Sequence, residues 1–192
     1  PHSGAGGFGG SGAEFVAAFA AGKPLAGGER ERCQFAWAAF DSRTDKSGSG
    51  ADILLQAYGV NLDGDFLLAM DIASRALERM EPRLGAELSL FHTGKKLSTH
   101  EHLATGPAMP AGSLGGITEL GLKALKEGSL TGFASALQEY GLALRAAGLL
   151  SPHSAQALDS LPRAKVRAAK GCGAMGADVL AVLHEGADLQ PW

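Results

Sequence analysis

PHSGAGGFGGSGAEFV, the stretch from Pro1 to Val16, decides which fold and which chemistry we expect of this chain. Glycine fills six of the nine positions from Gly4 to Gly12, and the residues that follow have helical composition. Such a loop leaves backbone N–H groups free to point at an anion, which then lies at the positive end of the helix dipole. Glycine also lets a phosphate approach the main chain closely. The stretch therefore predicts a polyphosphate-binding loop, with the hydroxyl of Ser11 at the helix entrance.

Two better-known glycine loops fit this stretch poorly. A P-loop requires Gly-Lys followed by Ser or Thr, but the first lysine of the chain is Lys23. A dinucleotide-binding loop would have to be placed on residues 4–9, where no strand precedes it and no clear βαβ unit follows. The other alternative is a flexible glycine-rich terminus, which is common at the ends of domains. In that case Ser11 would serve only as a helix cap.

Size, charge and cysteine content limit the classes of protein to which this chain can belong. The chain has 192 residues, of which 45% are hydrophobic, as expected of a folded globular protein. Its 17 basic and 20 acidic residues give a net charge of −3, which argues against a general nucleic-acid surface. No apolar run approaches the roughly 18 to 20 residues that span a bilayer, so we expect no membrane partner. Cys33 and Cys172 match no zinc or redox spacing, which favours free thiols in a reducing compartment such as the cytoplasm.

The hydrophobic pattern predicts an α+β fold. Helices are expected over residues 11–21, 29–40, 51–58, 114–127 and 130–147, and from Ser151-Pro152 onward. Strands are expected over residues 66–72, 86–92, 165–170 and 179–183. Residues 73–82 are ambiguous, and Ser98–Glu101 has the form of a capping box that opens a short helix. This order of elements favours helices that cover one face of a mostly antiparallel sheet.

A second candidate site lies where a polar loop leads into a helix. The segment DSRTDKSGSG, from Asp41 to Gly50, is polar and interrupted by glycine, and helical composition resumes at Ala51. Asp52 therefore falls in the first turn of a helix, where the helix dipole stabilises negative charge. Its carboxylate could serve the helix alone, or it could face a substrate.

Three separated segments together resemble the GHMP small-molecule kinases, a family that includes mevalonate, phosphomevalonate, homoserine and galactose kinases. Residues Gly4–Ala13 are similar to the nucleotide loop of the family, with Phe8 in place of a leucine, Gly10 in place of the first serine and Gly12 in place of an alanine. Residues Ser49–Asp52 look like the Ser-Gly-x-Asp stretch of mevalonate and phosphomevalonate kinases. Residues Lys170–Ala177 are similar to the C-terminal glycine loop, although Met175 stands where glycine is usual.

This resemblance implies a role for each matched residue. The nucleotide would be bound by the residues of the first segment, namely Gly4, Gly6, Gly7, Phe8, Gly9, Gly10, Ser11 and Gly12. Asp52 would be the catalytic base. Mg²⁺ would be held by Ser11 and by an acidic residue at the end of the preceding helix, for which Asp41 is the nearest candidate and a plain surface role is the alternative. The residues near the substrate would be Ser49, Gly50, Gly173, Ala174 and Gly176.

The resemblance also implies how the chain is divided. Residues 1–62 would be the remainder of an N-terminal domain that carries the nucleotide loop. Residues 63–192 would form a ferredoxin-like α+β domain with helices on one face of an antiparallel sheet. The chain begins with proline, and the first motif of the family, which carries a lysine, is missing. We therefore expect an upstream N-terminal segment, and a homodimer is compatible with the family.

The activity implied is ATP-dependent phosphorylation, with Mg²⁺, of a hydroxyl or phosphate on a small metabolite. Mevalonate or phosphomevalonate is the first expectation, because of the Ser49–Asp52 match, and either would place the enzyme in isoprenoid biosynthesis. Two alternatives stay open. One is a sugar kinase of the same family, and the other is a catalytically silent relative used for ligand sensing or protein interaction.

Overall fold

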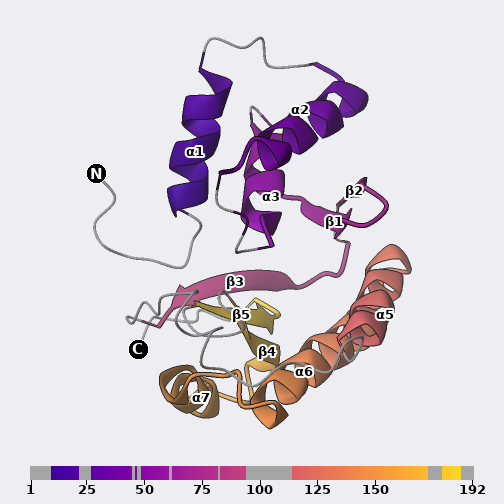
Figure 1. Cartoon of the computed structure of the whole chain (residues 1–192). Coiled ribbons are helices and arrows are strands. Elements are labelled where there is room, and N and C mark those ends of the chain that lie inside the picture. The colour runs from indigo at the N-terminus through magenta and orange to yellow at the C-terminus, as the bar shows by residue number, and fades with distance from the viewer. Residues whose placement is uncertain are drawn as a thin grey trace. The chain divides into compact units, whose positions relative to one another are not determined.

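The described part of the chain forms two compact units (Figure 1). The computed structural model describes residues 10–21, 27–44, 46, 49–60, 62–81, 83–93, 114–172 and 179–186, with the backbone alone at residues 10 and 11. We call Gly9–Glu81 the N-terminal unit and Pro82–Trp192 the C-terminal unit. The predicted division after residue 62 lies further toward the N-terminus than the division after Glu81.

Three helices build the N-terminal unit: α1 (Gly10–Ala20), α2 (Glu29–Asp41) and α3 (Ala51–Gly59). Each was predicted from its apolar spacing, and each begins and ends within a residue or so of the expected bounds. The helices share one apolar core, whose buried residues are Val16, Ala36, Trp37, Ala39, Leu54, Ala57 and Tyr58. Burial of this apolar surface, rather than helix propensity alone, holds short helices of this kind together.

A partly buried polar contact also joins α2 to α3. The hydroxyl of Tyr58 donates to the carboxylate of Glu29 at 2.5 Å, and a guanidinium nitrogen of Arg32 donates to the carbonyl of Val60 at 2.7 Å. Burial and the hydrogen bond to Glu29 raise the pKa of Tyr58, so the phenol stays a donor. These bonds satisfy polar groups that would otherwise be costly to bury.

A hairpin, β1 (Leu67–Asp71) and β2 (Ala76–Met80), completes the N-terminal unit. The strands are antiparallel, with Leu67 opposite Met80 and Asp71 opposite Ala76. Leu68, Met70 and Leu77 pack against the core of the three helices. This packing places the hairpin in the N-terminal unit, and residues 73–80 of the ambiguous stretch form a turn and a second strand.

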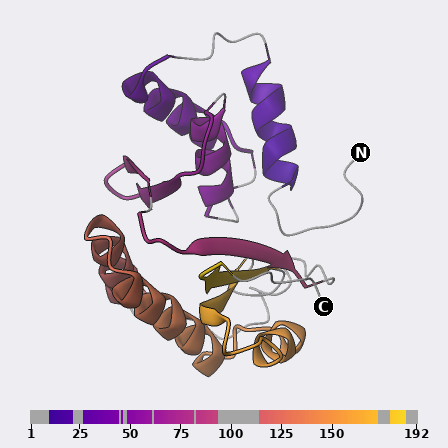
Figure 2. The same ribbon diagram turned by 180° about the vertical axis from the view of Figure 1, so that it is seen from behind.

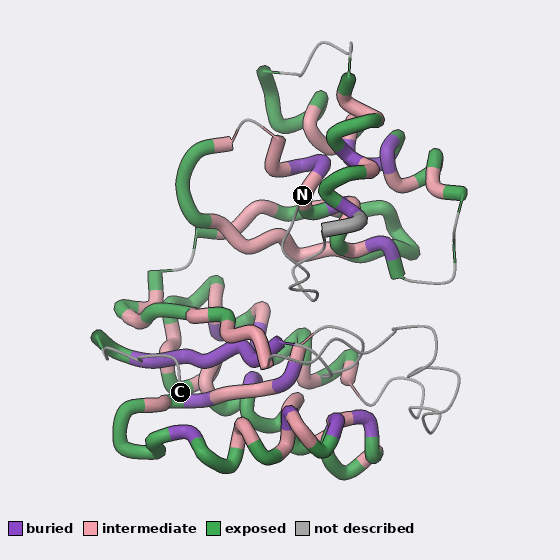
Figure 3. Tube along the Cα trace, turned by 90° about the vertical axis from the view of Figure 1, so that its left-hand side faces the viewer, coloured by how far each residue is buried: buried purple, intermediate pink, exposed green. Residues whose placement is uncertain are grey.

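The C-terminal unit contains a three-stranded antiparallel sheet in the order β3-β5-β4. Its strands are β3 (Glu87–His92), β4 (Val166–Cys172) and β5 (Val179–His184), close to the predicted ranges. All six residues of the central strand β5 are buried, as its continuous purple colour in Figure 3 shows. Burial of both its faces explains why β5 reads as an unbroken apolar run.

Among the described residues of this unit, three helices accompany the sheet: α5 (Gly115–Lys126), α6 (Leu130–Ala146) and α7 (Pro152–Asp159). The helix predicted from Ser151-Pro152 onward is confirmed: Ser151 caps it, since its Oγ accepts a hydrogen bond from the amide of Ser154 at 3.1 Å, and proline occupies the first helical position. The short helix predicted from Ser98 lies outside the described residues.

The helices of the C-terminal unit differ from the predicted one-sided arrangement. Leu183 of β5 belongs to a cluster with Leu137 of α6, whereas its neighbour Val182 belongs to a cluster with Ala157 of α7. Adjacent strand residues point to opposite faces, so α6 and α7 pack on opposite faces of β5. Figure 2 shows α5 and α6 together at one side of the sheet and α7 at the other. Both units together are α+β, and none of the described helices is long and apolar enough to cross a membrane.

The core of the N-terminal unit generates a stability prediction. Leu54 is fully buried, whereas Leu55, the next residue, is 40% exposed. We expect Leu54→Ala to lower the free energy of unfolding by about 2 to 5 kcal/mol, because it leaves a cavity. The matched control Leu55→Ala should cost about 1 kcal/mol or less. Urea unfolding followed by tryptophan fluorescence in a Trp192→Phe background, where Trp37 is the one remaining tryptophan, measures both. Equal losses would contradict this assignment of the core.

Candidate functional site

The glycine-rich stretch enters the described structure at the start of α1. Gly10, Ser11 and Gly12 form the first turn of this helix, so Ser11 lies inside the helix rather than at its cap. The N–H groups of a first helical turn have no acceptor within the helix, and they carry the positive end of its dipole. The predicted nucleotide-binding residues Gly4, Gly6, Gly7, Phe8 and Gly9 lie outside the described residues.

Asp52 lies directly beside this turn. It is the second residue of α3, and a methyl group added to Gly12 would stand 2.6 Å from Asp52 Oδ2. The same methyl group would stand 3.1 Å from Oε1 of Gln56, one turn further along α3. Gly12 is buried by this contact, which requires a residue without a side chain. The first turns of α1 and α3 therefore meet, and they bring two of the predicted site residues together.

The carboxylate of Asp52 is not committed to another protein group. The residue is exposed, and among the residues that the structure describes it has no hydrogen-bond or ion-pair partner. It stands at the N-terminal ends of two helices, where backbone N–H groups favour negative charge. A carboxylate in this setting can accept a proton from, or orient, a group bound next to it.

Ser49 and Gly50 shape the entry into α3. Gly50 is buried and adopts φ +70°, a left-handed conformation that favours glycine. Its carbonyl accepts the first hydrogen bond of the helix, from the amide of Leu54 at 3.1 Å. Ser49 Oγ accepts a hydrogen bond from the amide of Ala51 at 3.4 Å. These predicted substrate-proximal residues therefore lie within three positions of Asp52.

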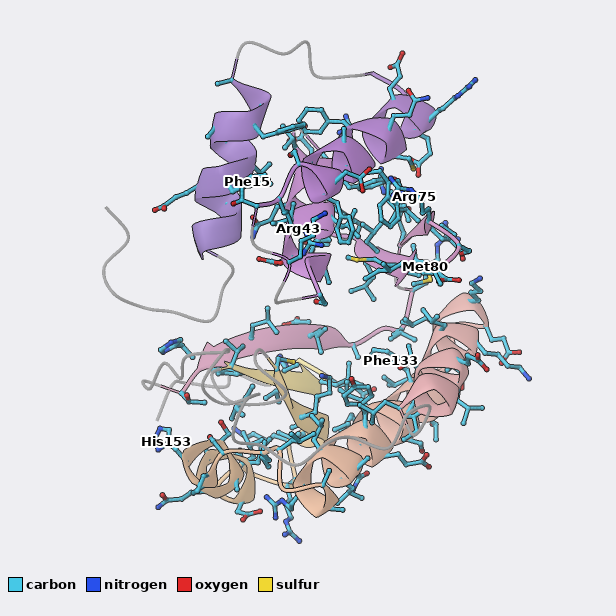
Figure 4. The ribbon with its side chains drawn as sticks, viewed as in Figure 1. Phe15, Arg43, Arg75, Met80, Phe133 and His153 are labelled. Atoms are coloured by element: carbon cyan, nitrogen blue, oxygen red, sulfur yellow. The ribbon has the colours of Figure 1, made fainter. Side chains whose placement is uncertain are left out.

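Arg43 is a residue of this site that sequence reasoning missed. Its guanidinium group occupies the space beside Gly50 where a side chain would otherwise stand. Figure 4 labels Arg43 at the end of α2, from which its side chain reaches the start of α3. In the sequence, Arg43 is one charged residue within a polar loop, and no motif or spacing distinguishes it.

Asp41, the predicted second metal ligand, is engaged elsewhere. Its two carboxylate oxygens accept hydrogen bonds from Arg75 at 3.1 and 2.8 Å, a bidentate pair on the surface. The hydrogen bond from Arg75 lowers the pKa of Asp41. The same guanidinium lies 4.4 Å from the centre of the Trp37 ring. Asp41 could bind a metal only by giving up this partner, and no group of three or more metal-ligating side chains occurs among the described residues.

The remaining predicted residues belong to the third glycine segment. Gly173, Ala174 and Gly176 lie outside the described residues, between β4 and β5 in the sequence. The prediction that they lie near a substrate stays a prediction.

No protein-family model and no curated protein matches this sequence. The case for a function therefore rests on the residues of the chain itself.

The contact between Gly12 and Asp52 generates a prediction that needs no activity. Gly12→Ala should gain up to about 1 kcal/mol from helix propensity, but with Asp52 present the added methyl group offsets part of this gain by displacing the carboxylate. In an Asp52→Ala background more of the gain should appear, with the remaining contact at 3.1 Å from Gln56 Oε1 still offsetting a part of it. Urea unfolding of the two single variants and the double variant measures the coupling between positions 12 and 52. An identical effect of Gly12→Ala in both backgrounds would show that the two residues do not touch.

Proposed function

We propose that this chain belongs to an ATP-dependent kinase of the GHMP type, which phosphorylates a hydroxyl group of a small metabolite. The observation that carries the proposal is the meeting of the first turns of α1 and α3, with Gly12 against the uncommitted carboxylate of Asp52. A phosphate-binding turn and a proton-accepting group at one place are what transfer of a phosphoryl group to a hydroxyl requires.

In the proposed reaction, backbone N–H groups at the start of α1 hold the phosphates of ATP. Asp52 accepts the proton of the substrate hydroxyl while the oxygen attacks the γ-phosphorus. The bond between the γ-phosphorus and the bridging oxygen breaks, and ADP leaves with that electron pair. Catalysis of this kind depends on positioning and on stabilisation of charge, and an exposed carboxylate on a fixed helical turn suits it.

Mg²⁺ bound with ATP would neutralise charge on the phosphates. Of the two predicted ligands, Ser11 lies on the first turn of α1, whereas Asp41 does not fit because Arg75 holds both of its carboxylate oxygens. The proposed reaction therefore assigns no step to Asp41.

The Ser49–Asp52 segment makes mevalonate or phosphomevalonate our first choice of substrate, ahead of a sugar. We further propose that the C-terminal unit is the ferredoxin-like domain of such a kinase. Its antiparallel sheet with α5, α6 and α7 is compatible with that assignment. A cytoplasmic location, where ATP is available, agrees with the free thiols of Cys33 and Cys172.

The test is ADP release by the protein expressed from its complete reading frame. With ATP and Mg²⁺, we expect ADP release that depends on mevalonate, phosphomevalonate or another alcohol in a panel that includes sugars. Asp52→Asn keeps the size of the side chain but removes the base, so kcat should fall by about 10² to 10⁴-fold while ATP still binds.

Asp63→Asn is the matched control, because Asp63 is an exposed carboxylate of the same unit outside the site. Its turnover should equal that of the unchanged protein. Undiminished turnover in Asp52→Asn would remove Asp52 from the mechanism. Absence of ADP release with every alcohol would favour the catalytically silent relative.

A further inference from the structure

Arg43 connects the end of α2 to the beginning of α3 through three contacts. Its Nε–H donates to the carbonyl of Phe40 at 2.9 Å, and its guanidinium carbon lies 3.9 Å from the centre of the Phe40 ring. Its terminal nitrogen Nη1 and its guanidinium carbon lie against Gly50. The planar guanidinium is thus held between an aromatic face and a backbone turn. An arginine side chain can fill such a position because its guanidinium group is planar and donates hydrogen bonds in several directions.

Arg43 affects the site through its contact with Gly50, the residue that precedes α3. A side chain there would overlap the guanidinium of Arg43 and would stand 2.8 Å from a ring carbon of Phe40. Its φ of +70° independently disfavours any other residue. Arg43 and Phe40 therefore form the wall against which the left-handed turn at Gly50 is packed. The direction in which α3 leaves that turn decides where Asp52 stands.

We propose that Arg43 is a positioning residue: by packing on Gly50 it holds the first turn of α3 so that the carboxylate of Asp52 stays against Gly12. This inference rests on the proposed function for its catalytic consequence, but the placement of Asp52 can be tested without it. Arg43 acts through geometry here, and its positive charge is secondary.

Two variants separate the shape of the Arg43 side chain from its charge. Arg43→Lys keeps the charge, but a lysine has no Nε–H placed to donate to Phe40 and no plane to lie on its ring. Arg43→Gln removes the charge as well. A displacement of about 1 Å in a reacting group can cost about 10²-fold in rate. We therefore expect both variants to lower kcat by about 10 to 100-fold, with KM for ATP within about twofold of the original value.

Arg79→Lys is the matched control. Arg79 also lies over an aromatic ring, with its guanidinium carbon 5.6 Å from the centre of Phe66, and it pairs with Glu81 on the hairpin. Its replacement should leave kcat unchanged. If Arg43→Lys keeps full activity while Arg43→Gln loses it, or if either variant mainly raises KM for ATP, Arg43 acts by its charge on the phosphates and the positioning role is overturned.

A second measurement separates this inference from the proposed function. The stability coupling between Gly12→Ala and Asp52→Ala is measured again in an Arg43→Lys background, which keeps the long side chain and so favours folding. If Arg43 places Asp52, the coupling should fall to zero. Persistence of the full coupling would overturn the proposal even in an active kinase. Loss of the coupling would support it even if the protein releases no ADP.

Discussion

The N-terminal unit depends on the absence of a side chain at position 12. A helix built from small residues at its start can approach another helix until only backbone and hydrogen separate them, and Gly12 allows α1 to approach Asp52 and Gln56 of α3 in this way. The larger residues of α1 that follow, Phe15, Val16 and Phe19, then fill the apolar core. The short sequence of α1 thus provides a close approach to α3 at its first turn and apolar packing further along the helix.

Glycine serves two different physical purposes in this site. At position 12 the backbone is helical, and glycine is required by the space that Asp52 occupies. At position 50 the backbone is left-handed, and the space beside it is filled by Arg43. The first glycine controls how near two helices come, and the second controls where one of them begins. Together they set the position of the carboxylate more firmly than any bond made by the carboxylate itself.

The elements of this fold could be predicted from the sequence because their signals are local. Apolar spacing, glycine after a helix and the Ser151-Pro152 start identify helices without knowledge of their partners. Gly12 is the one glycine of the predicted phosphate-binding loop whose surroundings the structure describes beyond the backbone, and it contacts Asp52, the predicted catalytic base. Phe8 and residues 173–178 of the third glycine segment lie outside the described residues.

What could not be predicted depends on residues far apart in the chain. Asp41 pairs with Arg75, 34 positions away, so a helix-terminal aspartate that looked available for a metal is engaged. The packing of α6 and α7 on opposite faces of β5 follows from which strand residues each helix meets, and the apolar run of β5 is compatible with either arrangement. The role of Arg43 likewise arises only once α2 and α3 are placed side by side.

Electrostatics limits how the proposed site can work. A carboxylate at about 4 Å from a phosphate charge is repelled by about 4 kcal/mol at an effective dielectric constant of 20, so the two can share a site only if positive charge offsets the repulsion. Two helix N-termini, those of α1 and α3, supply partial positive charges at this place. Asp41 differs from Asp52 in this respect, because the ion pair with Arg75 on the surface neutralises its charge. Of the two carboxylates, Asp52 is therefore the one whose charge remains available to a ligand.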